Sequence, residues 1–286
     1  MKLKKLVAIT LSAVMCMAAL TGCGGKSGSA KKTAKVIEVD LTDEQYAFGV
    51  DKDQPDLLKE VNQFVKDMKS DGTFDEICNR YFGDGTPVPV KSAAYDESKD
   101  QLVVATNAAF EPFEYMDGEN YVGIDMEIAK ALADKLGKEL VIQNMDFDAV
   151  CLSVGQHKCD VAMAGLTIKP DREEYVAFSD PYYSASQKLI TLSTDTEFDA
   201  CKTADDVNKI LEAKGSDLKI GFQNGTTGQF YCEGDDDWGF PGLKMESKGY
   251  KNGSLAVQDL LNGNINYVII DSAPAESITS SINKMQ

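Results

Sequence analysis

Histidine is nearly missing from this sequence, in which His157 is the only one among 286 residues. No cysteines or histidines have the C-x2-C or H-x3-H spacing of a metal site, so no bound metal is predicted. His157 lies in the polar turn Gly155-Gln-His-Lys158, where we expect a solvent-exposed side chain. No catalytic imidazole and no cofactor are therefore predicted.

Basic residues are also scarce. Lysine and arginine number 29 against 46 aspartates and glutamates, which gives a formal net charge of -17. Nucleic-acid binding needs clustered lysine and arginine to neutralise phosphates, so we exclude that class. A hydrophobic content of 43% describes a soluble globular protein, and the length suits one large or two ordinary domains.

An apolar run stands near the start of the chain, where Leu6 to Leu20 follow three lysines. A run this short predicts a cleaved export signal, residues 1–22, rather than a spanning helix. The ending Leu20-Thr-Gly-Cys23 resembles a bacterial lipobox, which implies acylation of Cys23 and leaves residues 23–34 as a tether. We therefore expect a lipid anchor on the extracytoplasmic face of the cell membrane. Ordinary secretion with a free Cys23 thiol is the alternative.

Five further cysteines follow Cys23. Outside the membrane an even number of them could form disulfides, with one left over. Cys151 with Cys159, and Cys201 with Cys232, are possible pairs, and Cys78 is the fifth. Buried free thiols are the alternative, because spacing alone fixes no pairing.

Strand and helix patterns alternate along most of the chain. Before the polar, proline-containing segment 83–101 we expect strands at 35–40 and 45–50 and two helices, the second opened by a capping box of Thr73 and Glu76. After it we expect strands at 102–106, 140–144, 161–164, 188–192, 218–222, near Leu243 and at 267–270, with helices between them. This order predicts two open α/β lobes that bind ligand at the carboxyl ends of their strands.

The stretch Ala164-Gly-Leu-Thr-Ile-Lys-Pro-Asp-Arg172 follows one of these strands. It combines free backbone groups, the hydroxyl of Thr167 and the forked cation of Arg172. Guanidinium binds carboxylate bidentately, so the stretch suits an anionic ligand group. A solvated surface arginine is the alternative for this motif on its own.

Several motifs occur together in one order. They are Val104-Ala-Thr-Asn-Ala-Ala-Phe-Glu-Pro-Phe-Glu-Tyr115, Tyr121-Val-Gly-Ile-Asp-Met126, Met145-Asp-Phe-Asp148, Asp160 to Arg172, Phe178-Ser-Asp-Pro-Tyr-Tyr183, Gly225-Thr-Thr-Gly228 and Val268-Ile-Ile-Asp271. With them the chain resembles the family 3 extracellular solute-binding proteins, the polar amino-acid receptors of ABC importers. The resemblance implies a two-lobe periplasmic-binding-protein-like (type II) α/β fold, a ligand cleft between the lobes and an ABC permease as partner.

The order of the segments departs from that family. Members normally continue beyond the Asp271 helix into a hinge strand and two terminal helices. Here the stretches that resemble those parts, Gln45-Tyr-Ala-Phe-Gly-Val50 and Asp71 to Gly83, stand at the front. We therefore predict a circular permutation in which residues 83–101 join the family's usual ends. Lobe 2 would comprise 35–42 and 188–286, and lobe 1 would comprise 43–187. Strand 35–40 must then lie in the sheet that carries Asp271.

The resemblance also implies roles for the polar site residues. Arg172 binds the ligand carboxylate, with Thr167 and Thr227 assisting at a helix start, while Asp271 binds the ammonium beside the Gly165 carbonyl. Ala164 completes the strand end. The alternatives are a helix N-cap for Asp271 and a simple turn at 225–228. That turn lacks the Lys-Ser/Thr ending of a P-loop, so a nucleotide is not expected.

The residues around the ligand side chain are less charged. Phe110 and Phe147 match positions that pack on the ligand in the family, although core filling is the alternative for any phenylalanine. Asn107 and Gln223, with Ile270 nearby, form a neutral set that predicts a polar, uncharged side chain. We expect a monomer that closes on its ligand by hinge motion at 42–46 and 184–190.

An enzyme on the same fold, such as a cyclohexadienyl dehydratase-like protein, is the alternative from another class. That chemistry needs a general acid or base in the cleft, and no histidine or spare carboxylate is placed for it. We therefore predict a receptor and not an enzyme. A sensory module is a third possibility, but no spanning helix or signalling domain follows the two lobes.

Overall fold

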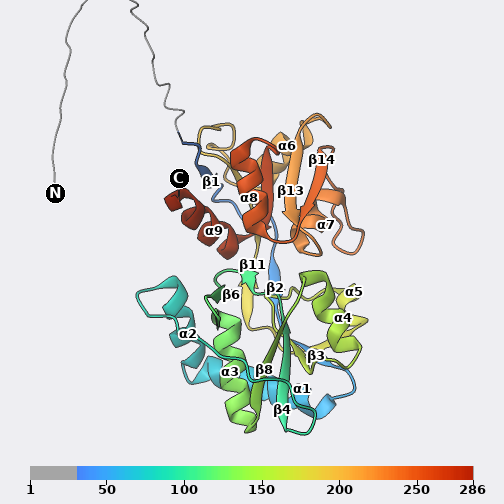
Figure 1. Cartoon of the computed structure of the whole chain (residues 1–286). Helices are drawn as coiled ribbons and strands as arrows, with labels where there is room; N and C mark the ends of the chain where they lie inside the picture. The colour runs from blue at the N-terminus through green and yellow to red at the C-terminus, as the bar shows by residue number, and fades with distance from the viewer. Residues whose placement is uncertain (1–30, 286) are drawn as a thin grey trace, which may run out of the picture. The chain divides into compact units, whose positions relative to one another are not determined.

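The computed structural model describes residues 31–285, and Lys32–Gln286 form one compact unit (Figure 1). The predicted signal 1–22, the predicted lipidation at Cys23 and most of the tether lie outside the described residues. Within 31–285 no helix combines the length and apolarity needed to cross a bilayer.

Two five-stranded sheets form the centres of two lobes. The sheet of lobe 1 has the order β10 (Val176–Phe178), β3 (Gly49–Asp51), β9 (Val161–Ala162), β4 (Gln101–Thr106) and β8 (Glu139–Asn144). The sheet of lobe 2 has the order β1 (Ala34–Val36), β12 (Gln187–Leu192), β15 (Tyr267–Asp271), β13 (Lys219–Gln223) and β14 (Glu246–Tyr250). Each sheet combines parallel pairs, such as β4 with β8, and antiparallel strands at one side.

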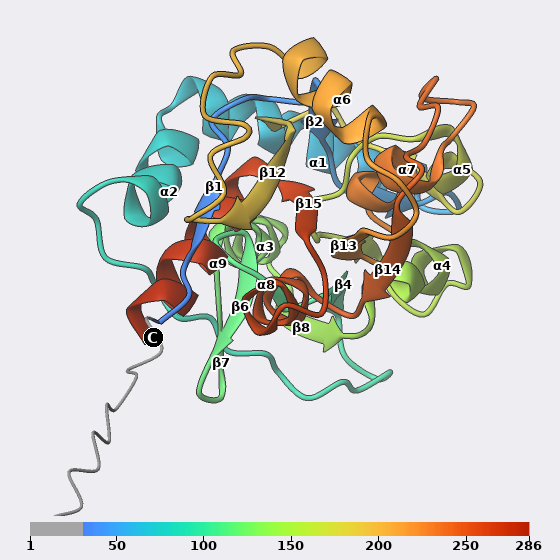
Figure 2. The same cartoon turned by 90° about the horizontal axis from the view of Figure 1, so that it is seen from above.

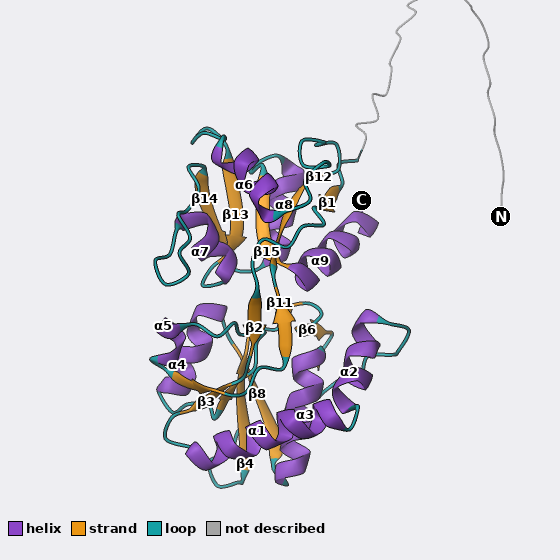
Figure 3. Ribbon diagram, turned by 180° about the vertical axis from the view of Figure 1, so that it is seen from behind, coloured by secondary structure: helices purple, strands orange, loops and turns teal. Residues whose placement is uncertain are grey.

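Helices cover the faces of both sheets (Figure 3). In lobe 1 they are α1 (Pro55–Ser70), α2 (Thr73–Phe82), α3 (Ile124–Leu136), the short 3-10 helix η1 (Phe147–Ala149), α4 (Val150–Gly155) and α5 (Pro170–Glu173). In lobe 2 they are α6 (Ala204–Glu212), α7 (Thr227–Glu233), α8 (Gly253–Asn262) and α9 (Ser272–Met285). Apolar burial against the sheets fixes them: Val154 of α4 packs in one buried cluster with Val103, and Leu211 of α6 in another with Ile220 and Ile269.

A two-stranded ribbon connects the lobes. Strand β2 (Glu44–Tyr46) pairs antiparallel with β11 (Tyr183–Ala185), between the two larger sheets in Figure 1. A further small sheet is formed by β5 (Ala109–Phe110), β6 (Glu114–Asp117) and β7 (Asn120–Val122). The ribbon overlaps both segments that the sequence predicts as the hinge, at 44–46 and 184–185, whereas residues 187–190 of the second segment belong to β12.

The first strand of the described chain lies in the sheet that carries Asp271. Ala34 of β1 pairs with Leu192 of β12, and β12 pairs with β15. The side chain of Asn283 in α9 accepts a hydrogen bond from the Ala34 amide (3.0 Å) and donates one to the Ala34 carbonyl (2.8 Å). Figure 2 shows α9 beside β1. The first and last elements of the unit are therefore neighbours.

Some local expectations are wrong. Helix α2 has Gly72 as its N-cap, with φ 89° and no side-chain cap, so Thr73 begins the helix and makes no capping box. The strand expected near Leu243 is β14, and the 45–50 strand is interrupted between β2 and β3. Segment 83–101 is also held to the lobe, because Val90 pairs with Tyr121 and the Ala93 amide donates to the Leu140 carbonyl.

The cysteines of the described chain are free thiols, namely Cys78, Cys151, Cys159, Cys201 and Cys232. Three are buried, and Cys78 and Cys201 are partly exposed. Neither suggested disulfide forms within residues 31–285, and the alternative of free thiols describes them.

Candidate binding site between the lobes

Arg172 is a buried cation held by backbone carbonyls. It lies on α5, which starts at Pro170, and its side chain is 9% exposed. One Nη atom donates to the Thr167 carbonyl (2.6 Å) and the other to the Gly225 carbonyl of lobe 2 (2.9 Å). The ring of Phe147 lies 5.3 Å from the guanidinium carbon. No carboxylate among residues 31–285 forms an ion pair with it, so its charge is not neutralised by the protein.

Asp271 is a buried anion at the end of β15 and is 4% exposed. The hydroxyl of Tyr46 donates a hydrogen bond to its Oδ2. No lysine or arginine of the described chain is in ion-pair contact with it. Burial, together with the negative charge of nearby Glu44, raises the pKa of Asp271 to about 7, while the Tyr46 bond opposes this rise. Asp271 thus lacks the cation that would stabilise its charged form.

Thr167 contacts both Arg172 and the residues around Asp271. Its carbonyl accepts from Arg172, and its hydroxyl donates to Glu44 at 2.8 Å. Tyr46 pairs with Thr167 through a backbone bridge, and the Thr227 hydroxyl lies 3.5 Å from that of Thr167. Residues of both lobes and of the connecting ribbon therefore meet at Thr167.

Gly165 has a backbone conformation that explains its place in the motif. Its φ is +54°, and an added Cβ would lie only 3.0 Å from the Phe110 ring. Its amide donates to Asp125 at 2.9 Å, and Ala164 beside it is buried. Glycine is therefore required for the close approach of Phe110 to the strand end.

Asn107 and Gln223 face each other across the lobes. The Asn107 amide donates to the Met145 carbonyl (2.7 Å), and its oxygen accepts from Gln223 at 3.1 Å. Oε1 of Gln223 is buried and has no partner in the described part of the chain. Because buried polar atoms are nearly always hydrogen-bonded, this oxygen is positioned to accept from a ligand donor.

The candidate site residues follow the carboxyl ends of two parallel strands in each lobe, as the fold predicts. Asn107 follows β4, the Ala164 stretch follows β9, Gln223 ends β13 and Asp271 ends β15. Ile270, in contrast, belongs to the core. Its Cδ1 would be 2.2 Å from a Cβ added at Gly253, so it packs on α8. Strand alternation places it opposite Asp271, and its inclusion in the neutral set was wrong.

Four acidic or phenolic side chains near the site were not predicted. Glu44 and Tyr46 alternate on β2 and both are buried, so period-2 spacing is a signal that could have found them. Asp125 accepts from the Tyr182 hydroxyl at 2.6 Å, and burial raises its pKa to about 6. Both carboxylate oxygens of Glu114 are buried without a partner among the described residues, and burial holds its pKa well above its ordinary value.

A second group of contacts joins the lobes beside Arg172. The ammonium of Lys169 is 2.9 Å from Asp171 in its own lobe and 3.2 Å from Asp235 in lobe 2. It also lies 4.6 Å from the centre of the Phe230 ring. Although burial lowers the pKa of Lys169, the hydrogen bonds that its ammonium donates to Asp171 and Asp235 raise it overall. Lys169, 3% exposed, is thus a buried ion-pair contact between the lobes.

Comparison with known families identifies the chain at the level of family and fold. The family model of the bacterial extracellular solute-binding proteins, family 3, matches residues 9–84 and 102–271. A solved structure titled an ancestral arginine-binding protein bound to arginine is 33% identical, covers 64% of this chain and 75% of its own, and superposes with a TM-score of 0.53. The predicted two-lobe type II fold is thereby confirmed.

Two curated relatives carry names of binding proteins and not of enzymes. The arginine-binding extracellular protein ArtP of Bacillus subtilis is 29% identical over 202 residues, which are 65% of this chain and 75% of the relative. The ABC transporter arginine-binding protein 1 of Escherichia coli is 33% identical over 175 residues, 61% of this chain and 64% of the relative. The chain belongs to the bacterial extracellular solute-binding proteins of family 3.

Proposed function

We propose that the chain is the receptor of an ABC importer and that it captures a free α-amino acid between its lobes. One observation carries this proposal: Arg172 and Asp271 are buried charges of opposite sign, and neither has a counter-ion within residues 31–285. An isolated buried charge is costly. The carboxylate and ammonium of an amino acid supply both missing partners at once.

The ligand side chain is proposed to be cationic, with arginine as the first candidate. This replaces the expectation of an uncharged side chain, which the comparisons do not support, since relatives named above are arginine-binding proteins. The unpartnered Oε1 of Gln223 suits a donor, and the negative charge of Glu44 lies near Asp271 in addition to the carboxylate that the ligand ammonium neutralises. Both features favour a ligand that carries positive charge and donates hydrogen bonds.

The enzyme alternative has less support. The curated relatives named above are binding proteins, and the site has no histidine. Turnover of prephenate or arogenate by the purified chain would support the dehydratase-like enzyme instead.

Anchoring and assembly remain parts of the proposal that rest on sequence. The lipobox-like ending at Cys23 supports a lipid anchor on the extracytoplasmic face of the membrane, and the receptor is proposed to act as a monomer that docks on a permease. Substitution Cys23→Ser should move the protein from the membrane to the soluble fraction of the producing cells. An unchanged membrane fraction would contradict the anchor.

The chain order is proposed to be circularly permuted. The position of β1 in the sheet with Asp271, the contact of Asn283 with Ala34 and the division of the family match around residues 85–101 support this order. Lobe 2 would then combine 35–42 with 188–286, and lobe 1 would be the continuous segment 43–187. The described ends lie side by side, which is the condition for joining them elsewhere.

A thermal-shift and calorimetric screen of the twenty amino acids tests the function. A ligand that binds the native state raises its melting temperature by mass action. We expect arginine to give the largest shift and a one-to-one calorimetric isotherm. A largest shift with glutamine would restore the uncharged side chain, and no shift with any amino acid would contradict the proposed function.

A further inference from the structure

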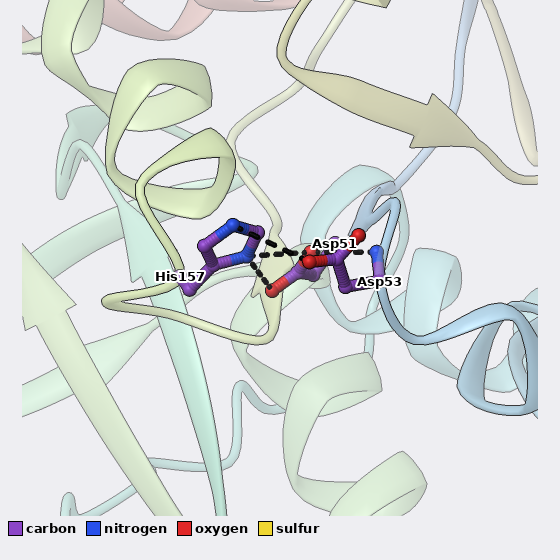
Figure 4. Close-up of side chains that lie close together, drawn as sticks. All are labelled: Asp51, Asp53 and His157. Carbon is purple, nitrogen blue, oxygen red and sulfur yellow. Dashed lines mark hydrogen bonds and ion pairs between the residues drawn. The ribbon is translucent and has the colours of Figure 1, made fainter.

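Two aspartates and the single histidine converge on lobe 1, at turns that are far apart in the sequence (Figure 4). Asp51 ends β3, Asp53 stands in the turn before α1, and His157 lies in the turn after α4. Nδ1 of His157 is 2.8 Å and 3.0 Å from the two oxygens of Asp51, and Nε2 is 3.5 Å from an oxygen of Asp53. One donor atom from each residue lies within 4.8 Å of the others.

The charge of this group is not balanced by lysine or arginine. Within residues 31–285, His157 is the only ion-pair partner of Asp51 and of Asp53. Lys52, which stands between them, donates instead to the Glu174 carbonyl at 3.1 Å. The two carboxylates therefore share one histidine as their partner. A neutral imidazole with two carboxylates is a set of ligands that binds divalent metal ions.

The positions of the side chains suit an open metal site. Asp51 is buried and fixed, because its Oδ1 accepts the Asp53 amide at 2.9 Å. The side chains of His157 and Asp53 are 55% and 79% exposed, so they can turn and leave room for water ligands. Bonds of about 2.0–2.2 Å to zinc place neighbouring tetrahedral donors about 3.3 Å apart. One donor atom from each residue already lies within 4.8 Å of the others, so rotation of the exposed His157 and Asp53 side chains would bring one imidazole nitrogen and both carboxylates to that spacing.

We propose that Asp51, Asp53 and His157 form a site for a divalent first-row transition ion, with zinc as the probe. The ion would replace the proton between the imidazole and the carboxylates, and water would complete its coordination. It would join the β3–α1 turn, from the N-terminal segment, to the turn before β9. We therefore expect zinc to stabilise lobe 1 without acting on the amino-acid site. A sequence motif does not reveal this group, because His157 and Asp51 are 106 positions apart.

The histidine was expected to be solvated, and the structure corrects this in part. Its ring remains more than half exposed, but Asp51 and Asp53 hold both nitrogens. An ordinary ion pair of protonated histidine with two carboxylates is the competing explanation. That pair would be weakened by His157→Gln but would bind no zinc, which allows the two to be separated.

The test is isothermal titration calorimetry with zinc chloride on the purified chain without a polyhistidine tag, near pH 7.5. We expect one zinc ion per chain, with affinity at least tenfold weaker in His157→Gln and in Asp53→Asn. Asp56→Asn is the matched control, because Asp56 is a nearby exposed acid outside the group, paired with Lys59. The control should bind zinc as the wild type does.

The free thiols are a possible source of unrelated zinc binding. Burial raises the pKa of Cys78 to about 12 and of buried Cys151 and Cys232 above the ordinary range, which disfavours the thiolate that zinc needs. Any binding to cysteine would also persist in His157→Gln. Unchanged zinc affinity in His157→Gln and Asp53→Asn, or no zinc binding by the wild type, would overturn the proposal. Arginine titrations of the same variants should match the wild type, so failure of the metal site is distinguishable from failure of the receptor function.

Discussion

Tyr46 donates a hydrogen bond to Asp271 although the two residues are 225 positions apart in the sequence. Tyr46 belongs to β2, one strand of the ribbon between the lobes, and Asp271 ends the central strand of lobe 2. Both side chains are buried, and the bond favours the ionised carboxyl group. The connection between the lobes therefore supplies part of the proposed ammonium site.

Substitution Tyr46→Phe should weaken amino-acid binding. A hydrogen bond to a charged group contributes about 1.5 kcal/mol or more, which corresponds to about tenfold in affinity. Calorimetric titration with arginine measures the change. Tyr183→Phe is the control, because Tyr183 stacks on Tyr46 at 5.7 Å on the neighbouring strand. Equal affinities of the two variants would argue against a role for the Tyr46 hydroxyl.

The raised pKa of Asp271 predicts a pH-dependent stability in the absence of ligand. A carboxyl group with a raised pKa in the folded protein favours the protonated form, so its contribution to stability is lost as the pH rises from about 4 to about 7. Asp271→Asn removes this loss. At pH 8 we expect the free energy of unfolding of the variant, measured by urea titration, to exceed that of the wild type. The difference should be at least about 1.4 kcal/mol, which corresponds to one pKa unit.

At pH 4 the same comparison should give a much smaller difference, because the folded wild type is then protonated at Asp271 and about half of the unfolded chains are protonated there as well. Buried acids that do not interact with Asp271 cancel in the difference, whereas Glu44 and Glu114 contribute through their repulsion with its charge. A variant that is less stable than the wild type at pH 8 would show that the site does not strain the carboxylate. The variant should also lose amino-acid binding.

Lys169→Met should weaken ligand binding by disturbing the contact between the lobes. It removes the ammonium between Asp171 and Asp235 and leaves those carboxylates together. We expect about tenfold weaker binding of arginine by calorimetry. Lys251→Met is the matched control, because Lys251 pairs with Asp146 across the lobes at 3.1 Å but is 72% exposed. Exposed pairs contribute about 0–1 kcal/mol, so a larger effect at Lys251 would contradict this ranking.

The permuted order predicts that the chain can be joined and opened elsewhere. A short glycine–serine linker from Met285 to Lys32, with new ends between Glu97 and Ser98, should give a folded protein that binds arginine as the wild type does. The Asn283–Ala34 contact keeps the joined ends adjacent, and Glu97 lies in an exposed turn. Circular dichroism and calorimetry would measure the result. An insoluble product would contradict the proposal, whereas opening inside β13 should abolish folding.

Much of the fold followed from sequence because local pattern and strand order agree. Helix α3, for example, lies between β4 and β8, where the alternating pattern predicts a helix, and it ends at Gly137 in the left-handed conformation. The capping box at Thr73 failed because Gly72 forms the cap with a positive φ, which a side-chain motif does not reveal. Strand β14 was displaced from Leu243 because its residues are half-buried and mostly polar, so they give little apolar signal.

The candidate site was predictable where residues follow strand ends. Asp271 ends β15 and Arg172 closes the continuous motif that follows β9. Glu44, Tyr46 and the partners of His157 were not found, because their contacts join the N-terminal segment to residues more than a hundred positions away. Ile270 faces the core, so it gives no information on the side chain of the ligand.

The most direct test of the central claim compares arginine with agmatine, which has the same guanidinium side chain but no carboxylate. The ligand carboxylate is proposed to bind buried Arg172, and the ligand ammonium is proposed to bind Asp271. Calorimetric titration of the wild-type chain should therefore show saturable one-to-one binding of arginine and at least a hundredfold weaker binding of agmatine. Equal affinity for the two compounds would contradict capture of an amino acid by its paired charges.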